Sequence, residues 1–199
     1  DMYDLRVPLC AEHELRIPWE TACEYVRESV KPLGEGYLTA VDQALTRRWI
    51  DPCECRGKKS GAYSGGCYDS PPYILMNYAG TLNDVFTLAH ELGHSLHSWH
   101  SRQAQEFHYA QYRIFVAEVA STTNELLLHH YLLHRPDCAG LRRQLLQHLL
   151  DEIRGTVIRQ TMFAEFEQQL HQRVEQGGAW TAEALDEAYY ALNRDYHGR

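Results

Sequence analysis

The segment His90-Glu91-Leu92-Gly93-His94 constrains this chain most, because it lies within a run of residues that is typical of one long helix. Thr81 can cap that helix, Asp84 can complete a capping box, and apolar residues recur at helical spacing from Leu82 to Leu96. Four residues turn a helix by about 400°, so both imidazoles leave the same face roughly 6 Å apart along the axis. One cation can therefore bridge them.

Glu91 lies between the two histidines, where it can accept a proton from a water molecule on the cation without being a ligand itself. A chain with twelve histidines can show the pattern H-E-x-x-H by chance. Its position inside a capped helix, directly after an apolar strand, favours a real site. We therefore predict one zinc ion per chain, with His90 and His94 as ligands and Glu91 as the catalytic base.

Two residues compete for the role of third ligand. His100 occupies the last position of the pattern H-E-x-x-H-x-x-G-x-x-H, but His97 replaces the glycine that turns the chain out of the helix. Glu118 lies in a second helical segment among Phe115 and other apolar residues, where a carboxylate is costly to bury without a cation. We predict Glu118 as the ligand, and a metzincin-type site that uses His100 is the alternative.

Two further polar positions accompany these candidates. Glu125 lies two helical turns after Glu118, where it can orient a ligand imidazole or remain a surface carboxylate. His130 and His134 are also four residues apart, but no glutamate lies between them. For this second pair we expect a polar helix face rather than a metal site.

The remaining patterns predict a mainly helical fold with a small β-sheet beside the active-site helix. We expect a short strand at Trp49 and Ile50, and a loop or hairpin over residues 51–72. We expect further helices over residues 18–30, 35–48, 113–135, 141–176 with a kink near Gly155, and 181–193.

An apolar and aromatic run directly before the motif helix predicts another strand. A zinc peptidase needs such a strand to hold an extended peptide by its backbone. The residues that we expect to bind substrate in this way are Tyr73, Ile74, Leu75, Met76, Asn77 and Tyr78.

Composition excludes several partners. The net charge of -8 and the absence of a basic run argue against nucleic acid and against anionic membrane surfaces. The six cysteines suggest free thiols in the cytoplasm, since a helical chain of 199 residues needs no disulfide staples. The spacing of Cys53, Cys55 and Cys67 lacks the paired C-x2-C arrangement of structural zinc modules.

The segments GKKSGAYSGG, PYILMNYAGTLNDVFTLAHELGHSLHS and RIFVAEVASTTNE resemble the oligoendopeptidase F branch of the thimet oligopeptidase family, in order and in spacing. This resemblance covers nearly the whole chain. It implies a cytosolic zinc endopeptidase that acts on short peptides, with two histidines and one glutamate as ligands. These roles fall on His90, His94 and Glu118, with the base on Glu91.

Members of that family are much longer than this chain. They have an N-terminal helical part that walls a channel, and a C-terminal part whose His and Tyr residues polarise the scissile carbonyl. We therefore expect residues 1–199 to be a partial catalytic domain that lacks both parts. The alternatives are a zinc-binding fragment that is inactive by itself and a peptide-binding module with a structural metal. The last aromatic cluster does not fit the family motif, and we expect it to pack or to lie on the surface: Tyr189, Tyr190, Tyr196 and His197.

Overall fold

The computed structural model describes residues 16–198, so Cys10, which we expect to carry a free thiol, lies outside the described residues. The chain divides near Leu145 into two compact units. Helices make up most of both units, and one three-stranded sheet accompanies them. The predicted fold class, mainly helical with a small sheet, is confirmed.

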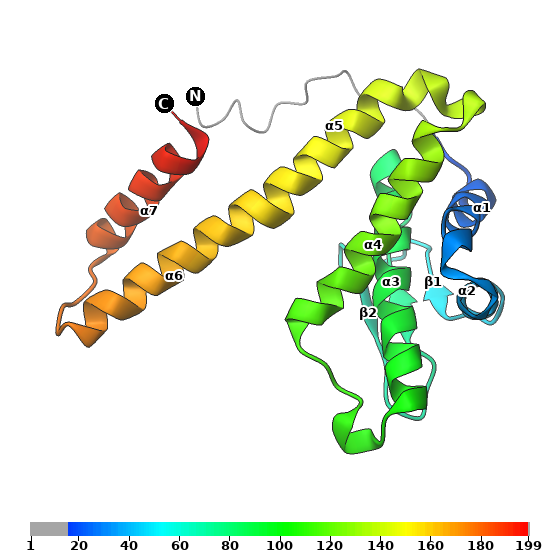
Figure 1. Ribbon diagram of the computed structural model, residues 1–199, viewed down its shortest axis with the longest axis horizontal. Helices are drawn as coiled ribbons and strands as arrows, with labels where there is room; N and C mark the ends of the chain where they lie inside the picture. The colour runs from blue at the N-terminus through cyan, green and yellow to red at the C-terminus, as the bar shows by residue number, and fades with distance from the viewer. Residues whose placement is uncertain (1–15, 199) are drawn as a thin grey trace. The chain divides into compact units, whose positions relative to one another are not determined.

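The larger unit carries four helices and the sheet (Figure 1). Its elements are α1 (Trp19–Ser29), α2 (Glu35–Thr46), β1 (Ile50–Asp51), β2 (Tyr63–Gly65), β3 (Tyr73–Leu75), α3 (Leu82–Ala104) and α4 (Ile114–Leu133). A short turn of 3-10 helix, Lys31–Leu33, joins α1 to α2. α3 and α4 lie side by side, and the strands lie against α3.

The start of α3 follows the predicted capping box. The Thr81 hydroxyl accepts a hydrogen bond from the Asp84 backbone N–H at 3.1 Å, and the Asp84 carboxylate accepts one from the Thr81 N–H at 2.9 Å. The helix then continues without a break to Ala104. The chain therefore makes no turn at His97, where a metzincin-type site would need one.

The sheet has the strand order β1-β3-β2, so β3 is the central strand. β3 pairs with β1 in parallel and with β2 in antiparallel orientation. Beyond β3, Met76 and Tyr78 donate their backbone N–H groups to the carbonyls of Asp51 and Pro52. A peptide therefore cannot pair with Tyr73–Leu75 as predicted, because neighbouring strands already occupy both edges of β3. For residues 76–78 the pairing stays a prediction.

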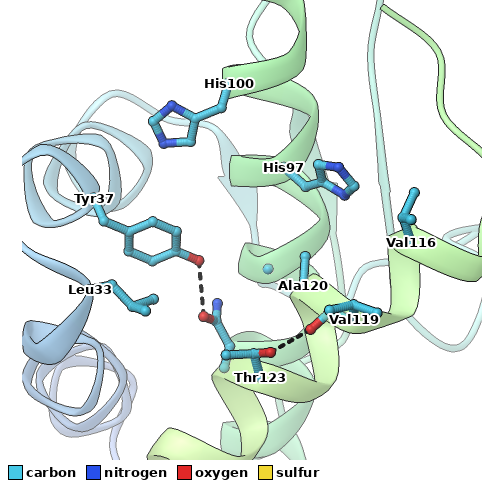
Figure 2. Close-up of a pocket in the computed structure, with 10 residues that line it drawn as sticks. Leu33, Tyr37, His97, His100, Val116, Val119, Ala120 and Thr123 are labelled. Atoms are coloured by element: carbon cyan, nitrogen blue, oxygen red, sulfur yellow. Dashed lines mark hydrogen bonds between the residues drawn. The ribbon is translucent and has the colours of Figure 1, made fainter.

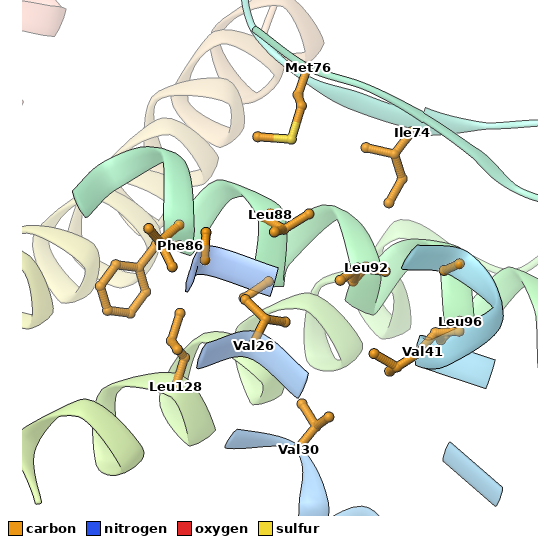
Figure 3. Packing of buried hydrophobic residues seen from close by; sticks show 14 of the residues in the cluster. Val26, Val30, Val41, Ile74, Met76, Phe86, Leu88, Leu92, Leu96 and Leu128 are labelled. Atoms are coloured by element: carbon orange, nitrogen blue, oxygen red, sulfur yellow. The ribbon is translucent and has the colours of Figure 1, made fainter. Parts of the chain in front are cut away.

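The core of this unit holds α3 between the sheet and the helices α1 and α4 (Figure 3). α3 is buried along one side, and the sheet and the neighbouring helices supply the other apolar side chains. Among the most deeply buried residues are Val26, Val30, Ile74, Met76, Phe86, Leu88, Leu92, Leu96 and Leu128. Dense packing of this kind fixes α3 as a rigid support for the side chains on its other face.

The described part of the smaller unit contains the end of α5 (Arg142–Glu152), a π-helical segment (Ile153–Ile158), α6 (Arg159–Glu175) and α7 (Ala182–His197). The π-helical segment contains Gly155, where the sequence predicts a kink. Thr181 caps α7 as predicted, by accepting a hydrogen bond from the Ala184 N–H. α7 continues four residues beyond the predicted end at Asn193.

The aromatic residues of α7 pack or lie on the surface. The Tyr189 ring contacts the Phe166 ring of α6, with centroids 5.3 Å apart. The Tyr196 hydroxyl donates a hydrogen bond to Glu165, and Tyr190 is exposed. These contacts agree with a packing or surface role for the cluster.

The described part of the chain has neither a disulfide nor a candidate membrane span. Its five cysteines, at positions 23, 53, 55, 67 and 138, are all unpaired. None of its helices combines the length and the apolar character that crossing a membrane requires.

Candidate metal centre

The two histidines of the motif and one glutamate of the next helix come together between α3 and α4. The candidate ligand atoms of His90, His94 and Glu118 all lie within 4.8 Å of one another. Glu118 Oε2 is 3.6 Å from His90 Nε2 and 3.7 Å from His94 Nε2. One cation at the centre of this triangle can therefore reach two imidazole nitrogens and one carboxylate oxygen.

Gly93 brings the two helices together at this point. A Cβ atom on Gly93 would lie 2.6 Å from Ser121 Cα and 2.8 Å from the Ala120 carbonyl oxygen. Only a residue without a side chain allows α4 to pass this close to α3. Gly93 was not predicted to have a role, although a glycine inside a long helix is a signal of close backbone approach.

Hydrogen bonds orient two of the candidate ligands. Glu125 is buried, and its Oε1 is 2.9 Å from His90 Nδ1. This contact makes Nδ1 the protonated nitrogen of a neutral His90 and leaves the Nε2 lone pair facing the centre. The Ser121 hydroxyl donates a hydrogen bond of 2.8 Å to Glu118 Oε2.

The surrounding protein groups shift the pKa of both imidazoles. Burial alone would lower the pKa of His90, but the hydrogen bond to Glu125 and the charges of Glu125, Glu91 and Glu118 outweigh it and raise that pKa. Burial lowers the pKa of His94, and the charge of His90 lowers it further. His94 therefore tends toward the neutral form, which is the form that binds metals.

Glu91 is not one of the three residues of the ligand triangle, and it is 7% exposed. Its Oε2 atom is buried and has no hydrogen-bond partner among the residues that the structure describes. Burial is the main reason why the pKa of Glu91 is raised. A buried oxygen without a partner is unusual in proteins, and it suits a group that waits for a proton from a bound molecule.

β2 lies beside this carboxylate. The backbone N–H of Ser64 is placed to donate to the Glu91 carboxylate, and the Ser64 hydroxyl is 2.7 Å from the buried Ser95 hydroxyl of α3. Neither serine was predicted to have a role. The glycine-rich composition around Ser64 could have indicated this role, because glycine favours close approach of the backbone to another group.

The register of the sheet shows which way the backbone of Ser64 faces. Ile74 directs its N–H to Trp49 on the β1 side, so its neighbours Tyr73 and Leu75 face β2. Their partners on β2 are Gly65 and Tyr63, and Ser64 between them faces away from β3. β2 is an edge strand in the described part of the chain, and its open edge therefore runs past Glu91.

His100 does not join the ligand triangle. Six residues of helix carry it about 9 Å along the axis from His94. Its ring stacks on Tyr37, with centroids 6.3 Å apart, in a pocket of about 410 Å³ between α2, α3 and α4. Figure 2 shows His97 and His100 on one side of this pocket, with Val116 and Val119 of α4 among the residues that line it.

Comparison with known proteins shows close relatives along the whole chain. Oligopeptidase PepF of Bacillus subtilis (strain 168) is 47% identical over 197 residues, which are 99% of this chain and 29% of that protein. The crystal structure of a Chlamydophila abortus protein superposes with a TM-score of 0.79 at 43% identity, over 98% of this chain and 33% of that one. The crystal structure of oligoendopeptidase-F from Enterococcus faecium superposes with a TM-score of 0.61 at 33% identity, over 100% of this chain and 27% of that one.

This chain therefore spans about a third or less of the length of these relatives. The model of peptidase family M3 matches residues 26–199, which include the ligand triangle, Glu91 and Glu125. The identity to PepF extends over the same segments. On this evidence, the chain belongs to peptidase family M3.

Proposed function

We propose that this chain is the zinc-binding part of the catalytic domain of an oligopeptidase, which hydrolyses short peptides. The ligand triangle of His90, His94 and Glu118 carries this proposal, because two imidazoles and one carboxylate with an open fourth position are typical of catalytic zinc. Relatives named oligopeptidase PepF and oligoendopeptidase F support the choice of substrate class.

The donor set and the orphaned oxygen of Glu91 both fit a zinc ion with a reactive water. Bound there, zinc supplies Lewis-acid activation of a water molecule and of the peptide carbonyl. Glu91 accepts the proton of the water on its free Oε2 and delivers it to the nitrogen of the departing amine. Glu125 holds His90 through Nδ1, so that Nε2 keeps its direction.

We propose that the substrate lies along the open edge of β2 rather than on β3. The Ser64 carbonyl faces that edge, beside Glu91, and can accept a hydrogen bond from a peptide N–H group. The hydroxyl contact between Ser64 and Ser95 anchors the strand to α3 at this point. Because such pairing recognises main-chain groups, we expect a broad sequence preference with a limit on peptide length.

The other proposed properties follow from charge and thiol chemistry. The acidic balance of the chain disfavours nucleic acids and anionic membranes as partners. The exposed thiols of Cys53, Cys55 and Cys67 suit a reducing compartment, and we place the protein in the cytoplasm.

The test uses two variants of the complete polypeptide that contains this chain. Glu91→Gln removes the base and no ligand, so we expect full zinc content and a loss of turnover by several orders of magnitude. His90→Ala removes a ligand, so we expect loss of zinc itself. Zinc is measured by elemental analysis, and turnover with a quenched fluorescent peptide of about eight residues. Retention of more than about a tenth of the activity by Glu91→Gln would refute the assignment of the base.

A further inference from the structure

α4 carries a second pair of histidines far from the ligand triangle. His130 and His134 lie at the C-terminal end of the helix, and their ring centroids are 4.3 Å apart. Both His130 and His134 are exposed. Glu118 lies twelve residues before His130, so about 18 Å of helix separates the two places. The ligand triangle and the second histidine pair therefore cannot form one binuclear centre, because the two metals of such a centre lie about 4 Å apart.

A hydrogen bond fixes the tautomer of one ring. His134 Nδ1 is 2.7 Å from the His130 backbone carbonyl oxygen. A carbonyl only accepts, so Nδ1 must carry the proton, and the lone pair of a neutral His134 is then on Nε2. Histidines that bind metals usually hold their other ring nitrogen in this way.

The C-terminal end of α4 also favours a cation beside these two rings. The last carbonyls of a helix carry partial negative charge, which attracts a cation to the end where both rings lie. The neighbouring Arg135 is engaged elsewhere, because its guanidinium pairs with Asp137 at 2.7 Å and hydrogen-bonds to the Tyr131 hydroxyl. Its charge is therefore partly neutralised by a carboxylate.

We infer that His130 and His134 form a second, weaker site for a late first-row divalent metal ion, with water completing the coordination. Imidazole pairs suit Ni²⁺, Cu²⁺ and Zn²⁺, and two protein ligands bind such ions less tightly than three. Spacing alone predicted a polar helix face for this pair, and the fixed tautomer of His134 together with the proximity of the rings changes that interpretation.

The test is a titration of the zinc-loaded 199-residue chain with Ni²⁺ in a calorimeter, after iodoacetamide has blocked the exposed thiols. We expect one further equivalent of Ni²⁺ to bind. His130→Gln and His134→Gln should each weaken this step by at least about tenfold, because each removes one of two ligands. His108→Gln is the control, since His108 is an exposed histidine on a separate short 3-10 helix, Phe107–Tyr109. This variant should bind Ni²⁺ as the wild type does.

Two further measurements keep the result specific. Bound Ni²⁺ should raise the thermal midpoint of the wild type and leave that of His134→Gln unchanged, because a ligand of the folded state stabilises it. His90→Ala should lose the first equivalent of zinc and keep the Ni²⁺ step, so this proposal can fail or hold independently of the proposed function. The inference would be overturned if no further equivalent of Ni²⁺ bound to the wild type, or if the Ni²⁺ step survived in both His130→Gln and His134→Gln. Loss of the Ni²⁺ step in His100→Gln, in place of these two variants, would also overturn it.

Discussion

Gly93 controls the distance between the two helices that carry the candidate ligands. A methyl group at this position would meet Ser121 Cα at 2.6 Å, and backbone cannot move aside as a flexible side chain can. We predict that Gly93→Ala destabilises the protein by about 1 to 3 kcal/mol, as other overpacked sites do. It should also weaken zinc binding, because Glu118 would move away from His90. Urea unfolding of the metal-free protein measures the first effect.

Gly36 provides a matched control for this substitution. It also lies within a helix, and a Cβ atom there would have no described atom within 4 Å. Gly36→Ala should therefore be neutral or stabilise the protein by up to about 1 kcal/mol. Equal stability of Gly93→Ala and Gly36→Ala would show that the close approach of α3 and α4 imposes no requirement for glycine.

Cysteine reactivity gives a second prediction at single residues. Burial raises the pKa of Cys23 to about 12, and the nearby charge of Glu20 adds to this effect. At pH 8 only about one Cys23 thiol in ten thousand is then the reactive thiolate. Iodoacetamide should modify the exposed Cys53, Cys55 and Cys67 well before Cys23, which a time course by mass spectrometry can follow. Equally fast modification of Cys23 would contradict its environment in α1.

Single residues differ in how far their roles could be predicted from the sequence. His90 and His94 were accessible because helix geometry alone places both on one face. Ser64 was not, because its position beside Glu91 depends on which edge of a short strand stays open. No local pattern records that choice.

The capping box gives α3 a defined start, which sets the position of every ligand on it. We predict that Thr81→Ala costs about 0.5 to 2 kcal/mol, because it leaves the Asp84 N–H without its acceptor. Thr87→Ala on the same helix is the control. Its hydroxyl donates only to the Asn83 carbonyl, and alanine has the higher helix propensity, so the loss should be near zero. Thermal unfolding of both variants compares them, and equal midpoints would argue against the cap.

Helices and strands were not equally predictable. Each helix has local signals, such as Thr81 and Thr181 as caps, and the predicted bounds agree with the structure within a few residues at most ends. The sheet joins strands of two or three residues that are far apart in the chain. Pairing of that kind is decided by tertiary packing, and this explains why β3 was wrongly taken as a free edge.

At the scale of the whole molecule, the relatives are about three times as long as this chain. We predict that the 199-residue chain binds zinc but cleaves an eight-residue fluorescent peptide much more slowly than oligopeptidase PepF of Bacillus subtilis. The resemblance places donors for the developing oxyanion in a C-terminal part of the family's members, and this chain spans only about a third of its relatives' length. Loss of one such donor typically costs about a hundredfold to a thousandfold in turnover. Comparable rates at equal zinc occupancy would show that zinc and Glu91 suffice.

The central claim is that one zinc ion binds between α3 and α4 on His90, His94 and Glu118. Anomalous diffraction at the zinc absorption edge, on crystals of the zinc-loaded chain, tests it most directly. We predict one strong peak about 2.0 to 2.2 Å from both Nε2 atoms and from a Glu118 oxygen, with a fourth position open. A peak coordinated by His100 in place of Glu118, or one coordinated directly by Glu91, would contradict the account.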